Sequence, residues 1–283
     1  MTAADPDEHR RASRERWEAA AAGWARRREG FHAALLPVSE WMVDAVAPQP
    51  GAVLVELAAG LGDTGLLAVQ RAQPGGRLLC TDGAQAMLDA AKEHARELGL
   101  DHLVEFRPME LEWLDLSAAT VDAVLCRFGY MLALDPAAAL RETRRVLKSE
   151  GRVALAVWDS EEHNPFSLGA HLVRLGHAAP PAPGEPGPFA LSDADALLEL
   201  VAGAGLFDAE LERVDVTFRA PSLDALWEQQ RDLSPRAREI VPRLSPAEHT
   251  HLRDAVDAAW APHVQPDGSV ALPGRVLCVA ASA

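Results

Sequence analysis

The residues best suited to chemistry gather around one glycine-rich turn. An apolar run leads into Ala58, Gly60 and Gly62 within the segment VLVELAAGLGDTG, and Asp82 follows about twenty residues later. Small side chains let the backbone turn sharply and approach a ligand closely, with the amides of a helix N-terminus behind the turn. The pattern GxGxxG followed by an acid is also that of a dinucleotide site, so the turn alone leaves the ligand open.

Glu56 distinguishes between these ligands, because it lies at the end of an apolar run that predicts a buried strand. A buried carboxylate is costly without a partner. The ammonium group of a zwitterionic ligand supplies one, whereas a pyrophosphate would be repelled. The alternative is that Glu56 only caps local backbone amides. Asp82 is suited to accept hydrogen bonds from two ribose hydroxyls, since one carboxylate can accept both.

Short apolar runs and helical patterns alternate along most of the chain, which predicts βαβ units and a parallel sheet buried on both faces. Helices are expected at 7–28, 33–47, 84–98, 136–147 and 192–204, with a further one starting at Thr64. The expected strands are 53–57, 78–81, 104–106, 121–126, 153–158, 209–218 and 276–280.

The chain divides into a helical cap over residues 1–50 and an α/β domain over residues 51–283. Within the second part, residues 160–190 include the run PPAPGEPGP and are expected to form an active-site loop. Residues 222–262 are helical in pattern, with Ser-Pro pairs typical of helix starts, and are expected to form a lid.

The bulk composition excludes several classes of function. The net charge of −15 opposes binding to nucleic acid or to an anionic membrane. Cys80, Cys126 and Cys278 lie in apolar runs without metal-ligand spacing, so we expect free thiols and no metal. A polar N-terminus and the lack of a long apolar run favour a cytoplasmic location.

The glycine-rich segment, together with the segments CTDGAQAML and DAVLCRFGYM and the block RRVLKSEGRVALAVWD, resembles class I S-adenosylmethionine (SAM)-dependent methyltransferases. The similarity is greatest to the branch that includes ubiquinone/menaquinone C-methyltransferases, the methyltransferase type 11-like proteins. It is strong over residues 50–160 and weaker at both ends. It implies a Rossmann-like α/β fold with a seven-stranded mixed sheet whose last strand is antiparallel, and with the cap and the lid covering the active site.

The resemblance also implies a SAM site, with S-adenosylhomocysteine (SAH) as the product. Glu56 matches the acid of the glycine motif, Asp82 the ribose-binding acid and Glu110 the acid that reads the adenine amino group. Ala58 stands where the family usually has its first glycine, and Glu110 where it usually has Asp. The full predicted cofactor set is Glu56, Ala58, Gly60, Gly62, Asp82, Gly83, Met87, Met109, Glu110, Leu111, Cys126, Arg127 and Phe128.

Methyl transfer requires alignment of nucleophile, methyl and sulfur, and needs a base only if the nucleophile must lose a proton. Tyr130 and His163 are the candidate catalytic residues, because they follow the fourth and fifth strands. Few fixed charges occur in the covering segments, which favours a small apolar or aromatic acceptor, and a helical lid also allows a homodimer. The alternatives are a SAM-fold enzyme of another reaction, such as a cyclisation or rearrangement, an NAD-dependent oxidoreductase, and a SAM-binding regulator.

Overall fold

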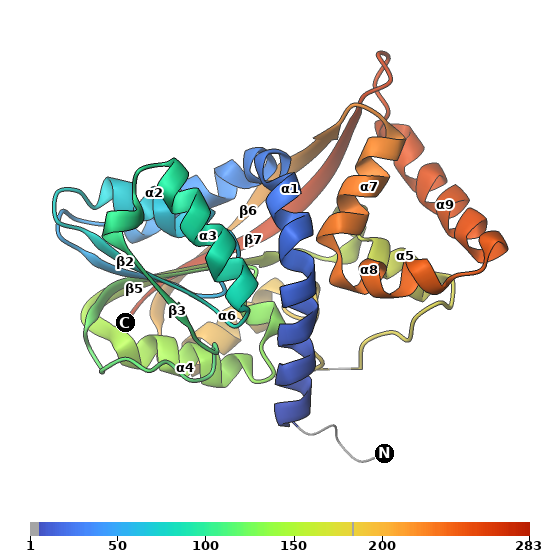
Figure 1. Ribbon diagram of the computed structural model, residues 1–283. Coiled ribbons are helices and arrows are strands. Elements are labelled where there is room, and N and C mark those ends of the chain that lie inside the picture. Colours follow the sequence, from blue (N-terminus) through green and yellow to red (C-terminus); the bar gives the residue numbers. More distant parts are fainter. Residues whose placement is uncertain (1–5, 183) are drawn as a thin grey trace.

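The computed structural model describes residues 6–182 and 184–283 (Figure 1), so the first five residues of the predicted cap lie outside it. Within these residues one sheet of seven strands has the order β3-β2-β1-β4-β5-β7-β6. The strands are β1 (Val53–Glu56), β2 (Arg77–Asp82), β3 (Val104–Pro108), β4 (Val121–Arg127), β5 (Leu147–Trp158), β6 (Phe207–Ala220) and β7 (Val270–Ser282).

The sheet is mixed, which confirms the predicted fold class. Strands β1 to β5 pair in parallel, whereas β7 is antiparallel to both β5 and β6. Strand β6 therefore runs in the same direction as β1 to β5. The carboxyl ends of six strands thus meet at one edge of the sheet, where ligands of open α/β sheets bind.

Helices cover both faces of the sheet. Figure 1 shows α2 and α3 on one face and α4 and α6 on the other. Because both faces are covered, central strand residues such as Leu54, Val124 and Leu155 are fully buried. The helices are α1 (Pro6–Val46), α2 (Asp63–Arg71), α3 (Gln85–Glu97), α4 (Pro136–Val146), α5 (Leu168–Arg174), α6 (Ala194–Gly203), α7 (Leu223–Leu233), α8 (Pro235–Ile240) and α9 (Pro246–Trp260).

Helix α1 is continuous, so the expectation of two separate N-terminal helices was wrong. An apolar stripe of Phe31, Leu35, Val38 and Met42 crosses the expected break at helical spacing, and all four side chains are buried in the main core. This packing holds the helix together even though Pro37 lies inside it and has no N–H for the helix ladder.

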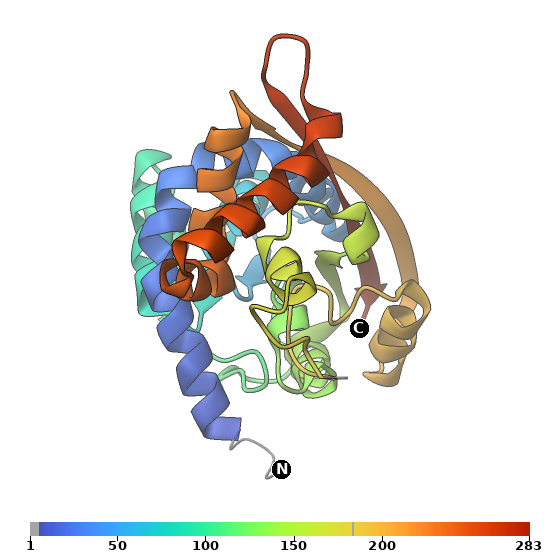
Figure 2. The same ribbon diagram turned by 90° about the vertical axis from the view of Figure 1, so that its right-hand side faces the viewer.

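The insert, residues 222–262, forms α7, α8 and α9 and follows β6 at the edge where the strand ends meet (Figure 2). Two ion pairs tie it to α1, since Arg26 and Arg27 both contact the largely buried Asp232 at 3.3 and 2.9 Å. The expected loop before α6 contains a short 3-10 helix, Glu161–His163, and the α-helix α5. No helix in the described ranges has the length and apolarity needed to cross a membrane.

Candidate active site

The turn after β1 adopts the backbone that the glycine pattern predicts. Gly60 and Gly62 have φ values of 55° and 77°, and Ala58 has a φ of 48° although it carries a side chain. A left-handed conformation costs a non-glycine residue about 1–2 kcal/mol. The methyl group of Ala58 fits because residue 129 is glycine: a Cβ there would lie 2.6 Å from the Ala58 Cβ. The space for the Ala58 methyl group is thus provided by the missing side chain at Gly129.

Glu56 is buried directly beneath this turn, with 2% of its surface exposed. Burial raises its pKa to about 8, against the opposing charge of Arg127 and the backbone amides of Gly65 and Thr64. Its Oε2 has no hydrogen-bond partner among the described residues. A Cβ at Gly65 would lie 2.5 Å from that oxygen, so the third glycine of the pattern makes room for Glu56.

Asp82 joins the end of β2 to the turn. One carboxylate oxygen accepts a hydrogen bond from the Gly60 amide and the other from the Ala84 amide, each at 2.9 Å. Burial raises its pKa to about 6. Because a carboxylate oxygen can accept a second hydrogen bond, Asp82 retains acceptor capacity for two further hydroxyl donors.

Behind the turn, Arg127 of the predicted cofactor set forms a buried pair with Asp63, which the sequence did not single out as part of the site. Arg127 contacts the Asp63 carboxylate at 3.2 Å and donates to the Ser39 hydroxyl at 3.0 Å. The His32 Nδ1 lies 3.2 Å from the same carboxylate. Burial alone would raise the pKa of Asp63, but His32 and Arg127 outweigh it and hold the pKa at about 2. The charged aspartate connects the first turn of α2 to α1 and β4.

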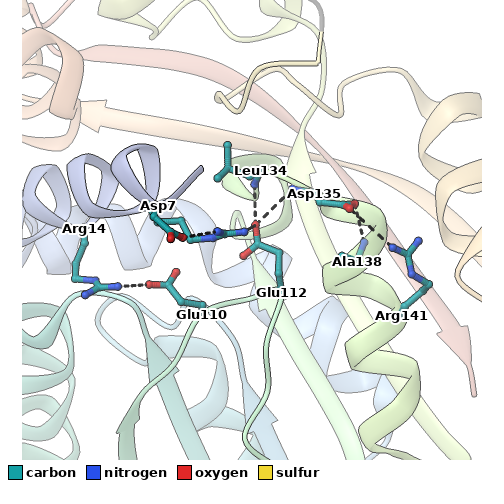
Figure 3. A network of polar contacts seen from close by, with 9 residues as sticks. Asp7, Arg14, Glu110, Glu112, Leu134, Asp135, Ala138 and Arg141 are labelled. Carbon is teal, nitrogen blue, oxygen red and sulfur yellow. Dashed lines mark hydrogen bonds and ion pairs between the residues drawn. The ribbon is translucent and has the colours of Figure 1, made fainter. Parts of the chain in front are cut away.

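A pocket of about 490 Å³ opens at the carboxyl ends of β2 and β3, where the adenosine was expected. Gly83, Met109 and Glu110 of the predicted cofactor set line it, whereas Met87 does not. Two residues of α1 line it as well. Arg14 contacts the Glu110 carboxylate at 2.5 Å (Figure 3), and Glu18 accepts hydrogen bonds from the first amides of α3.

The loop after β3 is held from two sides. Glu112 accepts hydrogen bonds from the Leu134 amide at 2.9 Å and the Asp135 amide at 3.4 Å, just before α4 (Figure 3). On its other side Arg10 lies 4.0 Å from the same carboxylate. Arg10, Arg14 and Glu18 are spaced by four residues, which is the signal that could have identified this face of α1 in the sequence.

Aromatic side chains lie next to one another from the carboxyl ends of β4 and β5 across to α1. Phe128, at a left-handed φ of 64°, stacks on Trp158 with ring centroids 4.2 Å apart. Five further rings continue the series from Trp158 to α1, and the centroids of neighbouring rings in it are 4.2 to 6.1 Å apart. We call this series the aromatic wall, which consists of Phe128, Trp158, Phe166, Phe218, Phe31, Trp24 and Trp17.

The two candidate catalytic residues lie in different environments, and their roles stay predictions. Tyr130 is buried, and its hydroxyl lies 2.5 Å from that of Thr143 on α4. His163 is partly exposed, with its Nε2 3.6 Å from a carboxylate oxygen of Glu162.

The remaining predicted cofactor residues, Met87, Leu111 and Cys126, are buried or partly buried side chains. Burial raises the pKa of the Cys126 thiol to about 12. No group of three or more His, Cys, Asp or Glu side chains in residues 6–182 and 184–283 could hold a metal ion.

Comparison with known proteins agrees with this geometry. Residues 57–155 match the family model described as a methyltransferase domain. The ubiquinone/menaquinone biosynthesis C-methyltransferase UbiE of Acidiphilium cryptum is 37% identical over 105 residues, which cover 37% of this chain and 41% of that protein. The chain therefore spans less than half the length of this curated relative.

Two solved structures have the same fold. The YcgJ protein of Bacillus subtilis superposes with a TM-score of 0.59 at 18% identity, covering 86% of this chain and 97% of that one. The [4+2]-cyclase SpnF has a TM-score of 0.53 at 20% identity, covering 87% and 80%. Residues 57–155 therefore match a methyltransferase domain, and this part of the chain is similar in sequence to ubiquinone/menaquinone C-methyltransferases.

Proposed function

We propose that this protein transfers the methyl group of SAM to an oxygen or carbon atom of a small, largely apolar or aromatic molecule. The observation that carries the proposal is the position of Asp82, whose two oxygens are fixed by the amides of Gly60 and Ala84 beside the glycine turn. This places a carboxylate at the strand end where a ribose would lie.

The residues present fit SAM at three points. The unpartnered Oε2 of Glu56 suits an ammonium group. Asp82 has acceptor capacity for ribose hydroxyls, and Glu110 borders a pocket of about 490 Å³ that has room for an adenine. When bound, SAM supplies an electrophilic methyl group, and the protein supplies the alignment and the exclusion of water.

The aromatic wall supports the proposed class of acceptor. Phe128 and Trp158 lie at the carboxyl ends of β4 and β5, where the acceptor of a class I enzyme would face the cofactor, and both are more than nine-tenths buried. Flat aromatic faces favour an aromatic or extended apolar ligand. His163, just past Trp158, is the candidate base for an acceptor that must lose a proton.

The experiment is a transfer assay with methyl-labelled SAM and a panel of naphthols, catechols and naphthoquinols, followed by product identification. Label in an extracted product, with equimolar SAH, supports methyl transfer. Conversion of an acceptor without SAH formation would instead support the alternative, a SAM-fold enzyme of another reaction. Turnover of NAD would support an oxidoreductase and contradict the proposal.

A further inference from the structure

A second and larger pocket lies against the first half of α1, on a different face of the helix from the adenosine pocket. Arg14 and Glu18 line the adenosine pocket, whereas Glu15 and Arg16 line the larger one, whose volume is about 1000 Å³. Helix α1 is therefore a wall that separates the two pockets. We call the larger one the cap–insert pocket, because α1 forms one side of it and residues 231–249 of the insert form the other.

Arg238 of α8 is held in a fixed position in the wall of this pocket. Its Nη2 donates a hydrogen bond to the Ala19 carbonyl at 3.1 Å, and its Nη1 lies 3.9 Å from a carboxylate oxygen of Asp232. Gly23 leaves room for the guanidinium, since a Cβ at that position would lie 3.0 Å from Nη1. A guanidinium that the fold already holds in place loses little freedom when it binds a ligand.

Asp232 does not neutralise the arginines around it. Arg26 and Arg27 contact this carboxylate at 3.3 and 2.9 Å, which is closer than Arg238. Three guanidinium groups therefore share one carboxylate, and each of them has five N–H donors. Positive charge and donors are in excess here, in a chain whose net charge is −15.

Three more basic side chains line the pocket from separate segments, namely Arg16 of α1, Arg231 of α7 and His249 of α9. Arg231 is paired with Glu228 at 2.5 Å. Arg16 is exposed and forms no ion pair or hydrogen bond within residues 6–182 and 184–283. The charge of Arg16 is therefore available to a ligand.

Acidic and apolar side chains complete the lining. Glu239 is paired with Arg243 at 3.4 Å, which leaves Glu15 as the acid that lowers the affinity of the pocket for an anion. Val241 and Leu244 add apolar surface between the charged groups. Such a lining suits a molecule that has an apolar body and one negatively charged group.

We propose that the cap–insert pocket is a binding site for a small organic anion. The guanidinium of Arg238 binds its carboxylate or phosphate group, and Arg16, one turn before Ala19 on α1, adds a longer-range attraction. The apolar body of the ligand lies against Val241 and Leu244. This site is separate from the SAM site, and the inference does not depend on the proposed function.

The first test is calorimetric titration of 2-naphthoate, and of its neutral analogue 2-naphthamide, into the ligand-free wild type. We expect 2-naphthoate to bind about tenfold more tightly, as one hydrogen bond to a charged group allows. This preference should largely disappear at about 1 M NaCl, because salt screens the attraction. Equal binding of the two compounds, or no binding of 2-naphthoate at millimolar concentration, would overturn the proposal.

The second test assigns the bound anion to this pocket. Arg238→Gln should abolish the preference for 2-naphthoate. Arg16→Gln should lower the affinity for 2-naphthoate by about two- to fivefold, and Glu15→Gln should raise it by a similar factor, because both side chains are exposed. Arg11→Gln is the matched control, since Arg11 is exposed on the same helix but does not line the pocket. An undiminished preference in Arg238→Gln, or equal losses in Arg16→Gln and Arg11→Gln, would show that the anion binds elsewhere.

Titration of SAH into the same proteins keeps this site apart from the proposed SAM site. Arg16→Gln and Glu15→Gln should bind SAH as the wild type does, because neither residue lines the adenosine pocket. Failure of the wild type to bind SAH would contradict the proposed function but would leave the result with 2-naphthoate intact.

Discussion

Replacement of Glu56 by Gln should change how the stability of the protein depends on pH. The ordinary pKa of a glutamate is 4.5, and burial raises that of Glu56 to about 8 in the folded chain. As the pH rises above 4.5, the unfolded chain releases this proton before the folded chain does. The part of the unfolding free energy that depends on Glu56 is therefore fully retained below pH 4.5 and is lost progressively as the pH rises to 8. At pH 7 the loss is about 3 kcal/mol, from 2.5 pH units at about 1.36 kcal/mol each.

Glutamine has nearly the same shape and does not ionise, so Glu56→Gln should not show this loss. Urea unfolding of both proteins at intervals between pH 4.5 and 8 measures it as a widening difference in unfolding free energy that favours the variant. Asp82 and Asp63 titrate in both proteins, so their contributions cancel in the difference. A difference that stays constant with pH would show that Glu56 is ionised in the folded protein and would refute the reasoning.

Ligand binding gives a second measure of the same group. If an ammonium group pairs with Glu56, binding of SAH at pH 7 should release about 0.9 proton, because a group with a pKa near 8 is mostly protonated at that pH. Calorimetry in buffers of different ionisation enthalpy measures the release, and Glu56→Gln should release none. Equal release in both proteins would assign the proton to another residue.

Two further predictions concern the glycine turn and the rim of the adenosine pocket. Gly129→Ala should destabilise the protein by about 1–3 kcal/mol, because a Cβ at 129 would lie 2.6 Å from both the Ala58 Cβ and the Cys126 Sγ. Adding Ala58→Gly removes one of these two contacts and should recover about 1 kcal/mol; strictly additive effects in urea unfolding would disprove the contact with Ala58. Arg14→Gln should tighten SAH binding by about two- to fivefold, because it frees the Glu110 carboxylate from an exposed ion pair, whereas Arg16→Gln on the same helix should not. Weaker binding after Arg14→Gln would show that the arginine itself holds the ligand.

The strands and the turn were predictable from the sequence because their signals are local. Each apolar run between helical patterns became a strand, and the small residues from Ala58 to Gly62 adopt left-handed backbone at three positions. The hydrogen bond from the Gly60 amide to Asp82 also follows from the order of the strands in the sequence. Strands β1 and β2 are adjacent and parallel, so the residues that follow them lie at the same edge of the sheet.

The rest of the site depends on contacts between residues far apart in the chain. Arg14 and Glu110 are separated by 96 residues, and no spacing rule connects them. The same holds for Ala58 and Gly129, where one methyl group at one position determines which residue fits at the other. Tyr130 illustrates a different limit: it follows β4 as expected, but a short turn directs its hydroxyl to Thr143 on α4.

The continuity of α1 was also beyond the local signals. Gly30 and Pro37 both favour a break, and only burial of the stripe from Phe31 to Met42 against the core holds the two halves in one helix. Tertiary packing thus determined how α1 reaches from the core to the adenosine pocket.

The most direct test of a SAM site at this turn is calorimetric titration of SAH, and separately of NAD, into the wild type and Asp82→Asn. We predict micromolar binding of SAH to the wild type, at least tenfold weaker binding to the variant because the charged acceptor is lost, and no binding of NAD. Binding of NAD alone, or SAH binding that does not depend on Asp82, would contradict the account.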